Sequence, residues 1–339
     1  MDPLSQGTVG AVFAQSTSNK SNIFKVGLIG FLAGLAPDLD VFIGSSTDPI
    51  LFLEFHRQFT HSLIFIPFGS LIVSLLVFPL VKRSMSFKNV YIASLLGYAT
   101  HGLLDACTSY GTLLFWPFSN ERITWNNISI IDPLFTIPVL LLAATAIKTK
   151  KKVFSFFAIG WIAFYLSLGF VQYERALSTA NELANSRGHN AERLTLKPSF
   201  GNLILWKSIY QHNDTFYVDA IRTVQLSTWC VGESIRAFDY EQHLPDLDED
   251  SQQKKDIERF RWFSQDYLGY DEEKNIVTDV RYSMIPNQID PMWGLVIDDQ
   301  LDINEHAIWW TSRSLDESQL DLFKDMLKGK KCKTSSRYD

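Results

Sequence analysis

Apolar residues are concentrated in the first half of the 339-residue chain, where they form runs separated by short polar stretches. Long runs occupy residues 62–81, 89–107 and 153–171, and shorter runs occupy residues 133–147 and 24–37. A helical run of about 20 mostly apolar residues matches the hydrocarbon core of a bilayer. The pattern therefore predicts an integral membrane α-helical bundle of about five apolar helices over residues 23–172. A large soluble helical core is the alternative.

Charged residues have the opposite distribution, with 17 of 68 between residues 23 and 172 and 49 from residue 173 onward. After an amphipathic linker helix at 172–188, alternating patterns predict a β-hairpin within 202–224 and strands near 276–285, 293–298 and 307–312. A helix is expected near 251–268. We therefore predict a soluble α+β domain over residues 173–339. The polar first 22 residues lack the pattern of a signal peptide and are expected to be a disordered tail.

Two short loops carry basic residues that predict the orientation in the membrane. Lys82, Arg83 and Lys88 follow the 62–81 run, and four lysines lie within 148–152. Short loops rich in lysine and arginine usually stay in the cytoplasm. We expect a multi-pass protein of the inner (plasma) membrane whose domain 173–339 lies outside the cytoplasm. The net charge of −6 gives no reason to expect a nucleic-acid partner.

The three cysteines do not have the spacing of a metal-binding pair. Cys230 and Cys332 would lie on the same side of the membrane and could form a disulfide, but nothing in the spacing requires it. We expect Cys107, Cys230 and Cys332 to be unpaired.

Carboxylates and imidazoles gather at the predicted outer ends of the apolar runs. His101 and Asp105 are four residues apart, so they would share one face of a helix. Carboxylate and imidazole suit divalent ions, with zinc favoured and manganese or iron as alternatives. A His/Asp pair on one helix is often no more than a hydrogen-bonded pair, and Asp132 could simply cap a helix. The convergence of several such residues at one membrane face nevertheless favours metal binding. The predicted ligands are Asp38, Asp40, His56, His61, His101, Asp105 and Asp132.

Two arginines and an aromatic loop lie near these residues in the sequence. Arg57 separates the two histidines of one segment, and Arg122 follows the apolar stretch 113–118. An arginine can hold a phosphate through paired hydrogen bonds, or it can pair with a nearby acid at the membrane interface. Trp116 and its neighbours would anchor the protein in the interface or guide a lipid-like substrate.

Four motifs resemble one known family. They are PDLD at 37–40, HRQFTHS at 56–62, HGLLDACTSYGTLLFWPFSNERITW at 101–125 and IIDPLF at 130–135. Their order and spacing, from about Leu28 to Phe135, resemble the YdjM family of membrane-bound proteins regarded as metal-dependent hydrolases. The stretch 197–218 is similar to the start of the C-terminal domain in longer members. The resemblance implies a membrane-bound hydrolase that uses divalent metal.

These observations lead to an expected activity. Metal-activated water would cleave a phosphoester or lipid-linked substrate at the outer membrane face, among membrane lipids. A carboxylate that does not bind metal would be the general base, with Asp40 as the candidate, and Arg57 or Arg122 would contact the substrate. Two alternatives stay open. One is a noncatalytic membrane scaffold with a structural metal, and the other is a metal or proton transporter whose ligands would lie at mid-membrane depth.

Overall fold

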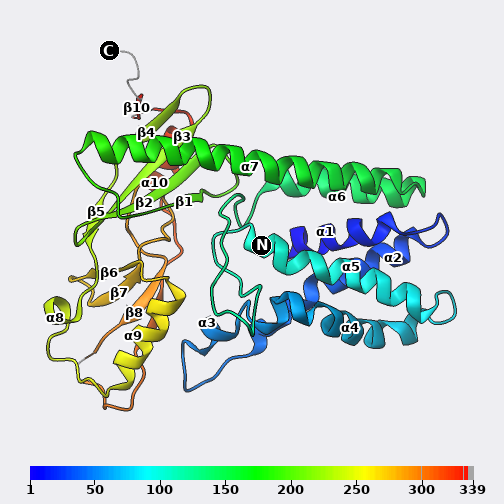
Figure 1. Ribbon diagram of the computed structural model, residues 1–339, viewed down its shortest axis with the longest axis horizontal. Helices are drawn as coiled ribbons and strands as arrows, with labels where there is room; N and C mark the ends of the chain where they lie inside the picture. The colour runs from blue at the N-terminus through cyan, green and yellow to red at the C-terminus, as the bar shows by residue number, and fades with distance from the viewer. Residues whose placement is uncertain (299, 331, 335–339) are drawn as a thin grey trace. The chain divides into compact units, whose positions relative to one another are not determined.

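The computed structural model describes residues 1–298, 300–330 and 332–334, which form parts of two compact units. The first unit comprises Met1–Ile43, Phe55–Val171 and Phe200–Asn202. The second comprises Gly44–Glu54, Gln172–Ser199 and Leu203–Asp339. One boundary falls inside a continuous helix, α7 (Val153–Ser186), which includes the predicted linker helix (Figure 1). The second unit also includes a short loop from the N-terminal half of the chain, Gly44–Glu54.

The first unit is a bundle of helices. Its elements are α1 (Pro3–Ser16), α2 (Ile23–Leu35), α4 (Ile66–Val81), α5 (Phe87–Ala106), α6 (Pro133–Thr149) and the start of α7, with 3-10 turns η1 (Ala36–Phe42), η2 (Phe59–His61) and η3 (Leu63–Phe65). Helix α1 packs against α2, α5 and α6, and α5 also packs against α2 and α4. Glycines permit this close packing, because a Cβ atom on Gly30 would lie 2.5 Å from the carbonyl oxygen of Gly10.

The N-terminal segment is ordered, so the expected disordered tail over residues 1–22 is wrong. Asp2 caps α1 by accepting a hydrogen bond from the Ser5 backbone nitrogen at 3.0 Å, and Pro3 occupies the first turn. The polar side chains of Gln6 and Gln15 are fully buried. Their polarity resembled that of a solvated tail, but they form hydrogen bonds inside the bundle.

Among the described residues, two helices are long and apolar enough to cross a membrane. They are Leu63–Val81, which contains η3 and α4, and α7, whereas α6 is a shorter apolar helix. Apolar side chains on α4 point outward, with Leu76 72% and Leu80 85% exposed. A soluble helical core would bury such residues, so this exposure indicates contact with lipid. The expected five apolar membrane helices are not supported, since α2 has only 13 residues and α5 is interrupted by polar residues.

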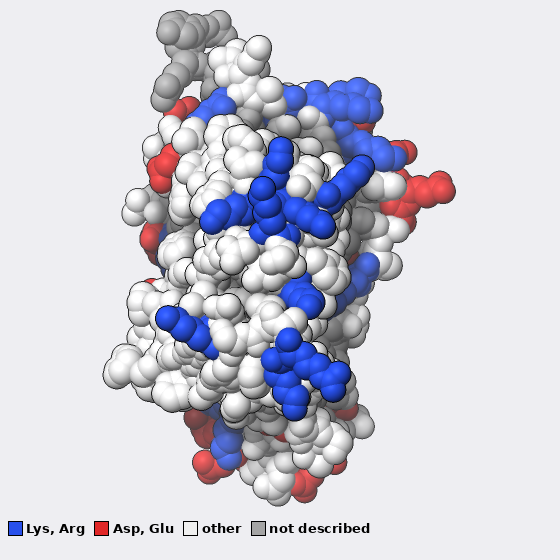
Figure 2. All heavy atoms as spheres, turned by 90° about the vertical axis from the view of Figure 1, so that its right-hand side faces the viewer, with Lys and Arg blue, Asp and Glu red and all other residues white. Residues whose placement is uncertain are grey.

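Basic side chains gather at one end of the helical unit (Figure 2). They come from the turns that join α1 to α2, α4 to α5 and α6 to α7. The exposed residues concerned are Lys20, Lys25, Lys82, Arg83, Lys88, Lys148, Lys150, Lys151 and Lys152. This end is the one at which α2 and α5 begin.

The second unit contains two antiparallel sheets among its described residues. One has the order β1 (Arg193–Pro198), β2 (Leu205–His212), β3 (Thr215–Thr223), β4 (Ser227–Cys230) and β10 (Lys333–Thr334), and β5 (Ser234–Arg236) also pairs with β3. The other contains β6 (Leu268–Asp271), β7 (Ile276–Asp279), β8 (Trp293–Val296) and β9 (Ile308–Thr311). The helices are α3 (Leu51–Phe55), α8 (Tyr240–His243), α9 (Gln252–Phe263) and α10 (Glu317–Leu327).

A disulfide joins Cys230 at the end of β4 to Cys332, next to β10. The expectation that these cysteines are unpaired is therefore wrong, whereas Cys107 is a free, buried thiol. The pair is separated by 102 positions in the sequence. Only the antiparallel pairing of β10 with β4 brings the two residues together.

Candidate metal centre

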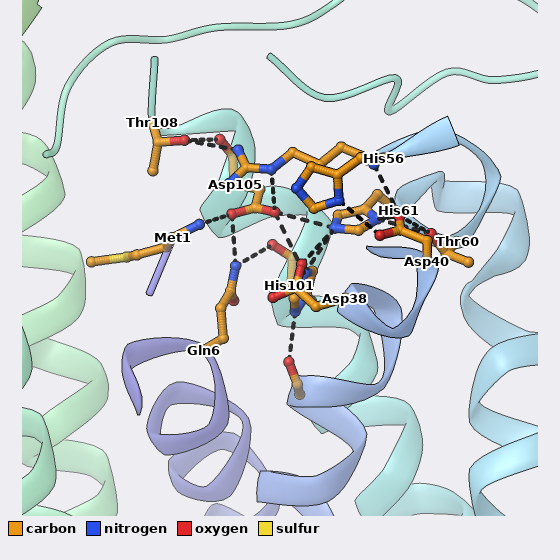
Figure 3. A network of polar contacts seen from close by, with 12 residues as sticks. Met1, Gln6, Asp38, Asp40, His56, Thr60, His61, His101, Asp105 and Thr108 are labelled. Carbon is orange, nitrogen blue, oxygen red and sulfur yellow. Dashed lines mark hydrogen bonds and ion pairs between the residues drawn. The ribbon is translucent and has the colours of Figure 1, made fainter. Parts of the chain in front are cut away.

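Four of the predicted ligands converge at the end of the helical unit opposite the basic turns (Figure 3). Asp38 lies in η1, directly after α2, and His61 ends η2. His101 and Asp105 lie one helical turn apart near the C-terminal end of α5. At 1.5 Å per residue, His101 lies about 21 Å along the helix from Phe87. Two helix ends and one short turn therefore build the cluster.

The nitrogen and oxygen atoms of this cluster face one another at short range. His61 Nε2 lies 3.4 Å from Asp38 Oδ1 and 3.2 Å from Asp105 Oδ2. His101 Nε2 lies 3.3 Å and 3.4 Å from the same two oxygens. The two Nε2 atoms are 2.9 Å apart. Ligand atoms bound to a tetrahedral ion at about 2.0–2.2 Å lie about 3.3–3.6 Å from one another. The four nitrogen–oxygen distances are close to this range, whereas the two Nε2 atoms lie closer together and would have to separate to bind one ion.

The hydrogen bonds on the far side of each imidazole also fit a metal site. His101 Nδ1 lies 2.6 Å from the Gly34 carbonyl oxygen, which can only accept, so the proton resides on Nδ1 and leaves a lone pair on Nε2. Asp105 Oδ2 is fully buried and lies 3.2 Å from both Arg57 Nε and His61 Nε2. A buried carboxylate needs nearby positive charge, which Arg57 supplies in part and which a metal ion or a proton on His61 would complete.

A proton on His61 can fill this role when metal is absent. Burial alone would lower the pKa of His61, but hydrogen bonds to Asp105, Asp38 and Asp40 raise it to about 10. Burial would likewise raise the pKa of Asp38, but bonds from His101 and His61 hold it well below its usual range. A divalent ion would displace the His61 proton, because a metal ligand must be deprotonated.

Asp40 holds His61 and its neighbours in place. Its Oδ2 accepts hydrogen bonds from the Arg57 backbone nitrogen at 2.9 Å and from Thr60 Oγ1 at 2.8 Å, and His61 Nδ1 lies 3.2 Å away. Its Oδ1 lies 2.8 Å from His56 Nδ1. Burial opposes ionisation, yet the bonds from His56 and His61 hold the pKa of Asp40 well below its usual range. A carboxylate that orients a ligand histidine is a recurring feature of metal sites.

A second group lies beside the first and shares one residue with it. Asp38, Asp40 and His56 each offer a ligand atom within 4.8 Å of the others. The side chains of Asp38 and His56 are 24% and 19% exposed, so this side of the cluster is the more open one. Burial lowers the pKa of His56, which keeps its imidazole neutral and able to bind metal. Six of the seven predicted ligands therefore lie in the two groups.

Asp132 does not join either group. Its Oδ1 accepts hydrogen bonds from the backbone nitrogens of Leu134 and Phe135, at 3.1 and 3.3 Å, and thereby caps α6. Its Oδ2 accepts a hydrogen bond of 2.8 Å from Tyr165. The structure corrects the ligand assignment of Asp132, because both oxygens serve local packing and the helix-cap interpretation holds.

Arg57, which was predicted to contact substrate, instead contacts Asp105, a candidate metal ligand. Its Nε lies 3.2 Å from Asp105 Oδ2, and its Nη1 donates to Thr108 Oγ1 at 3.1 Å. Its backbone has a φ of 64°, and its guanidinium lies 4.9 Å from the ring centre of Tyr110. Arg122 instead donates to the carbonyl oxygen of Gly111 at 3.0 Å, which holds the loop. A substrate contact by Arg57 stays a prediction.

The sequence analysis missed a contribution from α1. Gln6 Nε2 donates a hydrogen bond of 2.8 Å to Asp105 Oδ1, and the amino group of Met1 bonds the same oxygen. The available signal was the helix start formed by Asp2 and Pro3, an N-cap residue followed by proline. A helix predicted from this signal would have placed Gln6 among the polar residues inside the bundle.

The apolar helices and the Asp/His cluster define a membrane protein with a candidate metal site. Residues 1–176 match the family described as YdjM inner membrane protein, so the chain belongs to this family. It is also similar to the uncharacterized protein YfhP of Bacillus subtilis (strain 168), with 31% identity over 121 residues. That match covers 35% of this chain and 36% of YfhP. No solved structure matches this chain.

Proposed function

We propose that this protein is an integral membrane metal-dependent hydrolase that acts on a phosphoester or lipid-linked substrate. The convergence of His61, His101, Asp38 and Asp105 carries the proposal, because one ion could bind all four. Zinc suits this set of nitrogen and oxygen ligands best, with manganese and iron as alternatives. A bound divalent ion supplies an activated water near neutral pH and polarises the bond under attack.

The residues around the cluster have separate roles in this proposal. Asp40 orients His61, because Asp40 Oδ2 lies 3.2 Å from His61 Nδ1 and can accept the proton of that nitrogen. Both oxygens of Asp40 also take part in hydrogen bonds with His56 and with the Arg57 backbone. This arrangement makes Asp40 better suited to positioning than to the general-base role expected from the sequence. Arg57 places a buried positive charge beside Asp105, close to where a phosphate would bind.

The first test measures metal and activity together. Metal content of the detergent-purified protein is determined by mass spectrometry beside the Asp38→Ala, His101→Ala and Asp105→Ala variants. Hydrolysis of bis-p-nitrophenyl phosphate and of lipid phosphates is then assayed. The proposal predicts stoichiometric metal and hydrolysis in the parent, with both lost in folded variants. A parent that takes up neither zinc nor manganese on reconstitution would refute it.

A scaffold with a structural metal is the second candidate, and the four-ligand group favours it. Structural zinc sites are usually closed by four protein ligands, whereas catalytic sites keep one position open. The partly exposed Asp38 and the adjoining second group favour the enzyme. Tight metal binding without hydrolysis of either substrate class would support the scaffold. A transporter is less favoured, because the ligands lie at helix ends.

We further propose that the chain crosses the membrane several times and that the second unit lies outside the cytoplasm. The basic turns support a cytoplasmic position for the end of the helices at which they lie, which is opposite the Asp/His cluster (Figure 2). The Cys230–Cys332 disulfide is typical of an oxidising compartment outside the cytoplasm. Labelling of Ser186→Cys but not Thr149→Cys by an impermeant reagent from outside is expected. The reverse pattern would contradict this orientation.

A further inference from the structure

The chain between two members of the candidate site runs through the second unit. Residues 44–54 belong to that unit, whereas Asp40 before them and His56 after them belong to the first. The loop therefore leaves the site at one end and returns to it at the other. Contacts that fix the conformation of residues 44–54 therefore act on the segment that connects Asp40 to His56.

Arg259 of α9 is the centre of the contacts that hold this loop. Its Nη1 and Nη2 donate to the two carboxylate oxygens of Asp48 at 3.1 and 2.8 Å. Its Nε donates to Glu54 Oε1 at 2.5 Å. One guanidinium thus binds both ends of the loop segment 48–54. A forked pair fixes direction as well as distance, which a single exposed ion pair does not.

The surroundings of Arg259 hold its guanidinium in this orientation. Asp256 Oδ1 accepts a hydrogen bond from Arg259 Nη1 at 3.1 Å, and Asp256 Oδ2 accepts one from the Ala307 backbone nitrogen at 3.0 Å. Asp256 is itself fully buried, and His306 Nδ1 lies 2.8 Å from its Oδ2. Asp256 therefore fixes the orientation of the Arg259 guanidinium, whose remaining donors bind the loop.

Apolar contacts support the same docking. Ile50 and Leu53 of the loop are 0% and 2% exposed. Phe52 lies against Trp309 of β9 with ring centres 5.3 Å apart, and Trp309 also contacts Phe260 of α9. Buried aliphatic and half-buried aromatic side chains of this kind stabilise a docked loop by the hydrophobic effect. Residues 44–54 are thus an integral part of the second unit.

The returning end of the loop meets Asp40 directly. Helix α3 ends at Phe55, and the next two residues contact Asp40, through His56 Nδ1 at 2.8 Å and the Arg57 backbone nitrogen at 2.9 Å. We infer that Arg259 is a positioning residue, which binds Asp48 and Glu54, fixes the conformation of the loop that joins Asp40 to His56, and thereby presents His56 and Arg57 to Asp40. The inference rests on the proposed metal site, although not on hydrolase activity.

The test compares two arginines of one helix in the full-length protein. Arg259→Gln removes the anchor, whereas Arg261→Gln removes an arginine of α9 that pairs with Glu258 and Asp266 instead. Hydrogen exchange of the His56 and Arg57 amides is followed by mass spectrometry. Arg259→Gln should accelerate it about tenfold, the effect of losing one charged hydrogen bond, and Arg261→Gln should not. Equal exchange at both amides in the two variants would overturn the inference.

A double variant and a metal titration complete the experiment. If Asp48→Asn and Arg259→Gln act through one contact, combining them should accelerate exchange no more than Arg259→Gln alone, whereas additive effects would count against the anchor. Zinc affinity, measured by chelator competition, should fall about tenfold in Arg259→Gln and stay unchanged in Arg261→Gln. A parent that binds no zinc would refute the proposed function, while the exchange of the Arg57 amide would still decide the anchoring role.

Discussion

The Nε2 atoms of His61 and His101 lie 2.9 Å apart, although the two residues are 40 positions apart in the sequence. The His101 proton resides on Nδ1, where the Gly34 carbonyl oxygen accepts it. Two imidazole nitrogens facing each other between two carboxylates need a proton or a cation to bind them together. This geometry makes the cluster sensitive to substitution, to pH and to the residues that orient it.

Removal of either histidine should weaken metal binding. His61→Ala and His101→Ala each delete one of four convergent ligand atoms, so zinc affinity should fall by at least about tenfold. Zinc content after dialysis against a weak chelator measures this loss. His243→Ala in the second unit is the control, because His243 bonds the backbone of Asp239 in its own short helix. Full zinc retention in His101→Ala would mean that the ion binds elsewhere.

Zinc affinity should rise with pH. In the metal-free protein His61 holds a proton up to a pKa of about 10, and zinc must displace it. Below that pH each bound ion releases this proton, so the apparent affinity should increase about tenfold per pH unit. Competition titrations at pH 6.5, 7.5 and 8.5 check the slope. A flat profile would show that His61 is already neutral.

Gln6→Ala should weaken metal binding, whereas Gln15→Ala should not. Both glutamines are fully buried on α1, and each variant should lose about 1–3 kcal/mol of stability. Only Gln6 bonds Asp105, while Gln15 Nε2 bonds the carbonyl oxygen of Ala143. Zinc titration and thermal unfolding of both variants separate the two effects. Equal zinc affinities would remove Gln6 from the site.

The stability of the second unit should rise between pH 7 and pH 9. Burial lowers the pKa of Lys207 to about 7, whereas an unfolded chain keeps the ordinary value of 10.5. Between these values the unfolded chain binds a proton that the folded chain does not, so the free energy of unfolding increases with pH, by up to about 1.4 kcal/mol per unit. Urea unfolding followed by tryptophan fluorescence measures this slope. Lys207→Met should reduce this slope but not abolish it, because burial also lowers the pKa of Lys197, and the exposed Lys274→Met should leave it unchanged.

Loss of the disulfide should destabilise the second unit. Cys332→Ser frees β10 from β4 and should lower the free energy of unfolding by about 2–5 kcal/mol. Urea unfolding of the variant and of the reduced parent should give the same result, because both lack the same bond. A variant as stable as the oxidised parent would show that strand pairing alone holds this end of the chain.

Local patterns in the sequence were enough to identify much of the site. The spacing of His101 and Asp105 places both on one helix face whatever surrounds them, and Asp38 and His61 adjoin apolar runs. The β-hairpin of the second unit and the helix within 251–268 were also predicted, because alternation and helical periodicity are properties of neighbouring residues. The family followed from the order and spacing of the same motifs.

Only the tertiary structure decided the remaining features. Polar residues of α1 are buried because their hydrogen-bond partners, such as Asp105, lie about 100 positions away in the sequence. The Cys230–Cys332 pair and the docking of loop 44–54 by Arg259 also depend on distant segments meeting. The sequence by itself determined which residues can bind metal and which helices are apolar. Long-range packing determined which of those residues meet, because a side chain bonds the partner that the fold brings to it.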